Sequence, residues 1–354
     1  MTSSAYSIDR RARALGYTLI ELLIAMGLGV AILLALTVLF SQNSGNQMEL
    51  ERTVRQIENA RFSVDTLTED VMHAGFFSDF DPTRLGAAPA YTTPDPCDIR
   101  VRKLNAGDPA PQGWDASANP IQVPLPIEGI QAGRVVDCLA NRRANTEAIV
   151  IRRAETGPAV TWTAAKAAGH SNNLYIQAAR CESDPVPIRI SEIPGAEPEK
   201  TFDLRLPDCA TGNNALRRLS QRTYYVATCN DCVANDGIPT LKRVEMIDGA
   251  LRTTAIAEGV ENLQFEYGVD TTGDGVPDAM LTASAVAAAD WQNVVSVRMH
   301  VLTRTTQPTP GYVETRTYQV GPGVTLAAST FTDGFKRSLL STSVRLNNVG
   351  GRRE

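Results

Sequence analysis

The first feature of the hydrophobic pattern is an apolar segment near the N-terminus. Residues 22–40 carry no charge, and an α-helix of this length would span about 28 Å, close to the hydrocarbon thickness of a bilayer. Arg10, Arg11 and Arg13 precede the segment, which predicts a single-pass helix with a cytoplasmic N-terminus. A cleaved secretory signal is disfavoured because residues 37–40 offer no small-x-small cleavage site. A simple membrane anchor is the other alternative.

The pattern then changes to that of an amphipathic helix. Apolar residues recur at spacings of three and four, at Leu50, Val54, Ile57, Ala60, Val64, Leu67 and Val71. Charged residues between them predict a solvated face, made of Glu49, Glu51, Arg52, Arg55, Glu58, Arg61, Glu69 and Asp70. Gly75 favours an end to the helix. A coiled coil is the alternative, but a helix packed on a sheet is favoured because strand signals follow.

The rest of the chain has the pattern of an antiparallel sheet. Residues 82–126 contain nine prolines, which exclude a regular helix and indicate a long surface loop. Residues typical of strands occur at 147–152, 174–177, 223–227, 241–247, 250–256, 260–267, 294–304, 312–320 and 343–346. Asp248-Gly249 predicts a hairpin with a primed turn. One long helix followed by many strands predicts an α+β fold with antiparallel sheet on the helix.

Charge and cysteine content narrow the possible functions. The net charge of -5 includes no basic excess, so no nucleic-acid contact is expected. Every cysteine follows the apolar segment, at Cys97, Cys138, Cys181, Cys209, Cys229 and Cys232. An even number on one side of a membrane predicts disulfides in an oxidising compartment, and all 15 pairings stay open. Free thiols are one alternative; a zinc site is another, although no second CxxC or HxxxH completes it.

One loop offers candidate ligands for a metal ion. Positions one, three, five, seven and nine of a calcium loop are matched by Asp270, Thr272, Asp274, the carbonyl of Val276, and Asp278. Gly275 stands at the sharp turn, but Leu281 occupies position twelve, where an EF-hand has a bidentate glutamate. The preceding residues also read as a strand. A plain Asp-Gly turn is therefore the favoured alternative; calcium is a possible cofactor, and none is required.

The chain shows no pattern of catalytic residues. His73, His170 and His300 are far apart and belong to no metal motif. The sequence also has no nucleophile elbow, zincin motif or phosphate-binding loop. We therefore expect that the protein is not an enzyme.

Residues 16–25, GYTLIELLIA, resemble the class III signal of type IV prepilins. In that family a prepilin peptidase cuts after the glycine and methylates the new N-terminus. A glutamate then pairs with the terminal amine of a neighbouring subunit. The resemblance implies that Gly16 ends a leader of residues 1–16, that Tyr17 is the methylated N-terminus, and that Glu21 pairs in the fibre. Tyr17 departs from the usual phenylalanine.

The C-terminal half is similar to minor pilins of the PilW type, which are in turn similar to the J-type pseudopilin of type II secretion. The similarity rests on residues 259–270 with the Gly-Asp-Gly turn after them, and on residues 224–226, 241–243 and 344–348. It is weakest over 78–145. It implies a subunit that helps to initiate a type IV pilus, at the tip. Its partners would be other minor pilins, the major pilin, the prepilin peptidase and the inner-membrane assembly machinery.

This resemblance also implies a division of the chain and a location. A leader (1–16) is followed by the pilin helix (17–75) and a periplasmic β-rich domain (76–354) with a Pro-rich insertion at 82–126. The protein would enter the inner membrane and then reach the cell surface in the pilus. Val38 stands where many major pilins have a helix-breaking proline. The alternatives are a J-like pseudopilin and a membrane-anchored periplasmic binding module or adhesin.

The signal predicts a mature N-terminus at Tyr17. N-terminal mass spectrometry of membrane and fibre fractions should find a methylated Tyr17, because the peptidase site precedes an apolar helix. An intact Met1 or a new terminus after Phe40 would contradict the prepilin interpretation.

Overall fold

The structure is a computed structural model that describes residues 17–82, 93–98, 122–168, 173–192, 201–210 and 212–353. The chain divides into two compact units, Met1–Glu51 and Arg52–Glu354. The leader predicted at residues 1–16 lies outside the described residues, as does most of the Pro-rich range 82–126. The parts of that range at 93–98 and 122–126 belong to no helix or strand.

Helix α1 (Leu19–His73) has two chemically different halves. In the first unit, every large apolar side chain from Leu22 to Phe40 is more than half exposed. By length and composition α1 could cross a membrane. The hydroxyl of Thr37 donates to the carbonyl oxygen of Leu33 at 2.8 Å, so it is satisfied within the helix, as lipid requires. The helix continues through Val38 without a break.

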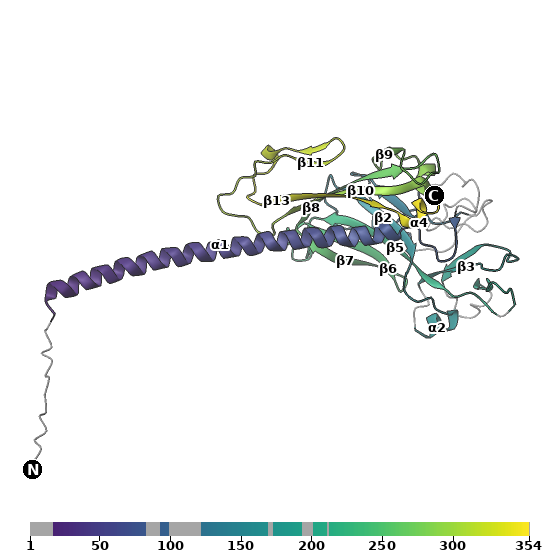
Figure 1. Cartoon of the computed structure of the whole chain (residues 1–354), viewed down its shortest axis with the longest axis horizontal. Coiled ribbons are helices and arrows are strands. Elements are labelled where there is room, and N and C mark those ends of the chain that lie inside the picture. Colours follow the sequence, from purple (N-terminus) through teal and green to yellow (C-terminus); the bar gives the residue numbers. More distant parts are fainter. Residues whose placement is uncertain are drawn as a thin grey trace, which may run out of the picture. The chain divides into compact units, whose positions relative to one another are not determined.

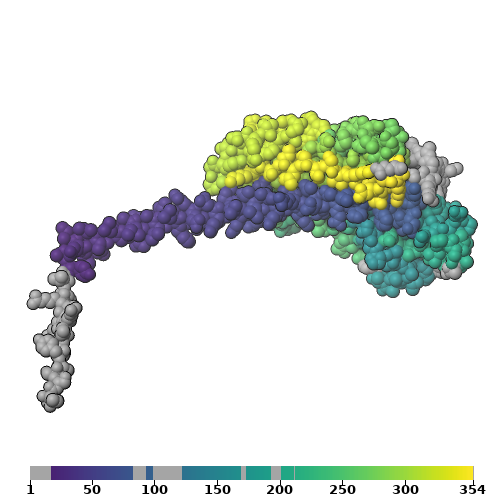
Figure 2. Space-filling model, in the orientation of Figure 1, coloured from purple at the N-terminus to yellow at the C-terminus, as the bar shows by residue number. Residues whose placement is uncertain are grey.

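The half of α1 in the second unit, from Arg52 to His73, lies against both sheets of that unit. The amide of Gln56 donates to the carbonyls of Thr303 and Lys336, in and next to the second sheet. Asn59 donates to the carbonyl of Glu258 in the first sheet. Figure 2 shows this part of α1, in blue, running alongside the yellow C-terminal strand.

The predicted apolar stripe is buried only in its last turns. Ala60, Leu67 and Val71 are fully buried, whereas Val54 and Ile57 are each 44% exposed. Polar Gln56, Ser63 and Asp70 are buried as well, so apolar spacing gave only part of the buried face and too great an extent.

Seven antiparallel strands form the first sheet (Figure 1). Five of them follow the order β1-β2-β5-β3-β4, and the long β5 also pairs with β6, which pairs with β7. The strands are β1 (Ile127–Ile130), β2 (Ala148–Ala154), β3 (Leu174–Ala178), β4 (Ile188–Glu192), β5 (Arg217–Ala227), β6 (Thr240–Ile247) and β7 (Ala250–Glu258). Between β6 and β7, Asp248 and Gly249 both have positive φ (52° and 75°), which confirms the predicted primed turn.

The second sheet has four antiparallel strands in the order β13-β10-β8-β9. They are β8 (Val260–Val269), β9 (Ala279–Leu281), β10 (Val294–Arg304) and β13 (Arg337–Arg345). A separate small hairpin is formed by β11 (Tyr318–Gly321) and β12 (Val324–Leu326). The short helices are α2 (Trp162–Ala167), η3 (Ala288–Asn293), η4 (Ala328–Thr330) and α4 (Asn347–Gly350).

The main hydrophobic core lies where the two sheets and the end of α1 meet. Leu67 and Val71 of the helix join one cluster with apolar residues of the first sheet, Ile149, Ile151, Tyr224, Val226 and Leu241. The second sheet contributes Leu263, Phe265, Tyr267, Val297, Met299 and Val301 to the same cluster. An α+β fold of one long N-terminal helix and antiparallel sheet is therefore confirmed.

Several strand predictions had the wrong extent. The predicted strand 312–320 is a strand only from Tyr318, and 343–346 is the end of a longer β13. The sequence analysis missed β1, β4, β9 and β12. β9 and β12 have three residues each, too few to show an alternating pattern.

Asp70 is the main departure from the predicted solvated face of α1. It is 2% exposed, and its carboxylate accepts hydrogen bonds from Arg153 (2.9 Å), Arg222 (2.8 Å) and the hydroxyl of Tyr224 (2.5 Å). These donors belong to β2 and β5. Burial, followed by the charge of Asp70, raises the pKa of Tyr224, so the phenol stays protonated and donates. A charged helix position thus faces the sheet because the sheet supplies matching donors.

Replacing Asp70 tests this contact. Asp70→Asn should destabilise the second unit by about 3 kcal/mol or more, because the buried guanidinium of Arg153 would lose its counter-ion and that of Arg222 would keep only Glu245. Urea unfolding of a fragment that starts at Glu49 measures the effect. Asp65→Asn, on the exposed surface of the same helix, is the matched control and should change stability little. Equal effects of the two substitutions would contradict the role of Asp70.

Candidate functional site

The predicted processing and assembly residues lie at the start of α1. Gly16 lies outside the described residues, and Tyr17 is 89% exposed. Thr18 and Glu21 form a reciprocal capping box. The backbone amide of Thr18 donates to Oε2 of Glu21 at 2.9 Å, and the amide of Glu21 donates to the hydroxyl of Thr18 at 3.3 Å. Glu21 therefore has a structural role that the sequence analysis did not recognise.

The carboxylate of Glu21 retains capacity for a further partner. The backbone amide and the hydroxyl of Thr18 both donate to Oε2, and a carboxylate can accept about four hydrogen bonds over its two oxygens. An unpaired carboxylate at membrane depth costs about 2.5–3.5 kcal/mol on insertion scales. A cationic partner would remove much of that cost. Cleavage after Gly16, methylation of Tyr17 and pairing of Glu21 stay predictions.

All six cysteines form disulfides, as predicted. The pairs are Cys97–Cys138, Cys181–Cys209 and Cys229–Cys232, with Cα–Cα distances of 5.6, 5.2 and 5.0 Å. No cysteine is free, so the alternatives of buried thiols and a zinc site are wrong. Pairing from sequence alone was out of reach because two of the bridges join residues 41 and 28 positions apart.

The three disulfides differ in how much chain they close. Bridges over separations of 41 and 28 residues each reduce the entropy of the unfolded chain by an amount worth about 4 kcal/mol. The Cys229–Cys232 bridge closes a separation of three, which is worth about 1.5 kcal/mol on the same scale. The long bridges therefore have a clear structural role, and the short bridge has a much weaker one.

The candidate calcium loop follows β8, and its carboxylates accept hydrogen bonds from the protein itself. Asp270 is 1% exposed and accepts from the amides of Gly273 (2.6 Å) and Gly275 (2.9 Å). Asp274 accepts from the amide of Val276, and Asp278 from the amide of Thr271 at 2.7 Å. These contacts describe the favoured alternative, an Asp-Gly turn.

Arg353, near the C-terminus, is a partner of this loop that sequence reasoning missed. Its guanidinium donates to the carboxylate of Asp270 at 3.1 Å and to the backbone carbonyl of the same residue at 3.0 Å. Burial raises the pKa of Asp270, but the amides of Gly275 and Gly273 and the charge of Arg353 outweigh it and hold that pKa below its ordinary value. Asp270 is thus charged and neutralised by an arginine. No pattern in the sequence marks this arginine.

The remaining candidates do not come together. Within the described ranges, no group of three or more His, Cys, Asp or Glu side chains could hold a metal ion. His73 contacts the carbonyl of Glu69, and His300 contacts Glu266 and Ser341. His170 lies outside the described residues. Calcium binding stays a prediction.

Comparison with known proteins gives one family. Residues 223–348 match the sequence model of PilW, the type IV pilus-assembly protein W. The matched range covers just over a third of the chain. No curated protein matches the sequence.

Among solved structures, a type IV-like pilin from Thermus thermophilus is similar to this chain. The two chains are 11% identical, with a TM-score of 0.26. The match covers 63% of this chain and 84% of the pilin.

The PilW-matched region includes the whole second sheet and the last part of β5. It also contains the Asp270–Asp278 loop and the Cys229–Cys232 disulfide. The residues that carry the predicted family resemblance, 224–226, 241–243, 259–270 and 344–348, all lie inside it.

Calcium binding by the loop is tested by thermal unfolding of the fragment that starts at Glu49. If calcium displaces Arg353 from Asp270, millimolar calcium should raise the melting temperature, and Asp274→Ala should abolish the rise. Affinity should be modest, on the order of 10⁻⁴–10⁻³ M, because Leu281 supplies no ligand. Asp290→Ala, outside the loop, is the control. If calcium does not shift the melting temperature of the unsubstituted fragment, the loop is an Asp-Gly turn that does not bind calcium.

Proposed function

We propose that the protein is a minor pilin of the PilW type. It is inserted in the inner membrane, loses its leader after Gly16, and is incorporated into a type IV pilus. It acts at the tip, where it helps to initiate assembly with other minor pilins. The observation that carries the proposal is the PilW match over residues 223–348, in the same chain as an exposed apolar helix.

The exposed half of α1 supports a role in both membrane and fibre. Its large apolar side chains are more than half exposed from Leu22 to Phe40, and water is a poor environment for that much apolar surface. Lipid covers such a surface in the membrane. In a fibre, the corresponding helices of neighbouring subunits would cover it. The same apolar side chains can contact lipid in the membrane and neighbouring helices in the fibre, because van der Waals packing contributes to helix association in an apolar environment.

Glu21 supports a transfer of the subunit from the membrane to the fibre. As a carboxylate in an apolar region it favours any arrangement that brings a cation to it. A processed N-terminus supplies one, since a terminal amine is positively charged at neutral pH. We infer that Glu21 pairs with the methylated amine of a neighbouring subunit as the protein leaves the membrane.

The second unit supports a binding role rather than catalysis. Several of its buried charged residues form ion pairs, among them Asp70 with Arg153 and Glu261 with Arg337. Such pairs orient sheets and loops. We therefore propose a structural subunit without enzymatic activity, whose sheets face other pilins.

Substitution of Glu21 tests the proposal. Glu21→Ala should leave the amount in the membrane fraction unchanged or higher, and should lower recovery in sheared fibres by tenfold or more. A tenfold loss corresponds to about 1.4 kcal/mol, less than the insertion penalty of an unpaired carboxylate. Immunoblots of the two fractions measure both amounts.

Two further variants separate the charge from its helix-capping role. Glu21→Gln retains a capping-box residue but removes the charge, so it should fail in the fibre as Glu21→Ala does. Glu51→Ala removes an exposed carboxylate beyond the apolar run and should behave as wild type. Equal recovery of all four proteins in fibres, or an uncut leader, would instead favour a membrane-anchored binding module.

A further inference from the structure

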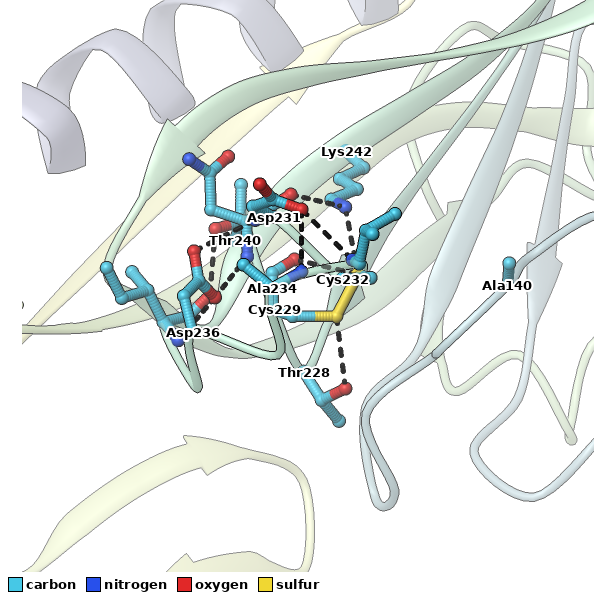
Figure 3. The surroundings of a disulfide bond; sticks show 12 residues. Ala140, Thr228, Cys229, Asp231, Cys232, Ala234, Asp236, Thr240 and Lys242 are labelled. Atoms are coloured by element: carbon cyan, nitrogen blue, oxygen red, sulfur yellow. Dashed lines mark hydrogen bonds between the residues drawn. A yellow bond between two sulfur atoms is a disulfide. The ribbon is translucent and has the colours of Figure 1, made fainter.

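The connection between β5 and β6 is a loop that carries the Cys229–Cys232 disulfide (Figure 3). Two aspartates hold its backbone. Asp236 accepts from the amides of Asn230 (3.0 Å) and Asp231 (2.8 Å). Asp231 itself accepts from the amides of two residues further along the loop. The loop therefore has a hydrogen-bonded framework that does not depend on the sulfur bridge.

The two sulfur atoms of this bridge have different surroundings. Cys229 is 3% exposed, whereas Cys232 is only half-buried. The ammonium of Lys242, on β6, lies 3.3 Å from Sγ of Cys232 and donates to the carbonyl of Asn230 at 3.0 Å. Lys242 is itself 8% exposed. Its charge is therefore held against the more accessible sulfur.

A fixed cation next to a sulfur atom changes the chemistry of the bridge. Thiolates are stabilised by a neighbouring lysine, and a disulfide that releases a stabilised thiolate is easier to reduce. At the other two bridges, the polar groups of the described residues that contact a sulfur atom are neutral. Arg205 lies near the Cys181–Cys209 bridge, but it donates to the carbonyl of Cys209 at 2.9 Å and to the hydroxyl of Ser183 at 3.0 Å rather than to a sulfur. The amide of Cys138 lies 3.0 Å from Sγ of Cys97, and the hydroxyl of Ser183 lies 3.1 Å from Sγ of Cys181.

We propose that Cys229–Cys232 is a thiol–disulfide exchange site that accepts electrons from a dithiol. A thiolate of the dithiol attacks Sγ of Cys232, the S–S bond breaks, and Cys229 leaves as a thiolate that takes up a proton. The second thiol of the reductant then attacks the mixed disulfide. Cys232 is released as a thiolate beside the ammonium of Lys242. The loop gains two electrons, and the dithiol becomes a cyclic disulfide.

Accessibility and structure agree with this direction of attack. The attacked sulfur is the half-buried one, and the leaving sulfur is the buried one. The aspartate hydrogen bonds and the pairing of β5 with β6, from Arg222 to Ala227, do not require the bridge. Opening it therefore leaves the sheet intact, unlike opening of the bridges that close long segments.

Selective reduction of the full chain in detergent tests the proposal. The protein is equilibrated at pH 8 with mixtures of reduced and oxidised dithiothreitol, quenched with acid, alkylated, and mapped by mass spectrometry. Cys229 and Cys232 should be half reduced at a certain ratio of reduced to oxidised dithiothreitol. The other four cysteines should need a ratio at least tenfold higher. A tenfold change in this ratio corresponds to about 30 mV in the reduction potential of the bridge.

Variants of the lysine test its part in the exchange. Lys242→Met keeps an unbranched side chain, one atom shorter, but removes the charge, and should make the bridge about tenfold harder to reduce. Lys242→Arg keeps the charge and should retain most of the wild-type behaviour. Lys166→Met, on the exposed surface of α2, is the matched control and should leave all three bridges unchanged.

Two results would overturn the proposal. One is reduction of Cys97–Cys138 or Cys181–Cys209 in the wild-type chain before, or together with, Cys229–Cys232. The other is a folded Lys242→Met protein whose bridge is reduced at the wild-type ratio. The first result needs no variant, so the proposal can fail even if Lys242→Met does not fold.

Discussion

The arrangement of α1 on the first sheet depends on the interaction of the buried Asp70 carboxylate with two arginines. A desolvated carboxylate is tolerated only with strong partners, and Arg153 and Arg222 donate to it from two adjacent strands. Burial disfavours the charge on Arg222, but Asp70 and Glu245 outweigh that effect and raise the pKa of the guanidinium. The last turns of α1 are therefore fixed in rotation and in height against the first sheet.

The chain direction after α1 follows from that fixed position. At Gly75 the backbone adopts a φ of 73°, and a Cβ there would lie 3.1 Å from Pro126 and from Val349. The amide of Gly75 donates to the carbonyl of Arg152 in β2. The helix thus ends directly on the sheet, and Phe77 enters a second core cluster with residues of β3 and β4. The ion pairs of Asp70 and the turn at Gly75 together set the position from which the chain leaves α1.

Local patterns in the sequence predicted those features that depend on neighbours along the chain. The exposed apolar helix and the long strands β8 and β10 have a repeating pattern of side chains, and the Asp248-Gly249 turn has a characteristic dipeptide. What the sequence did not predict depends on residues brought together by folding. Asp70 had the pattern of a solvated position, and the Arg353 partner of Asp270 comes from a segment 83 residues away. The disulfide pairing is of the same kind.

Two of the disulfides and the third serve different physical purposes. The Cys97–Cys138 and Cys181–Cys209 bridges connect loop segments and restrict the unfolded chain, because each closes a long stretch of it. Hydrogen bonds to Asp231 and Asp236 already hold the Cys229–Cys232 loop. Cys229 is buried, and Cys232 is only half-buried. A bridge that contributes little to folding can open without loss of the fold. Of the three bridges, Cys229–Cys232 is therefore the one suited to thiol–disulfide exchange, whereas the other two stabilise the fold.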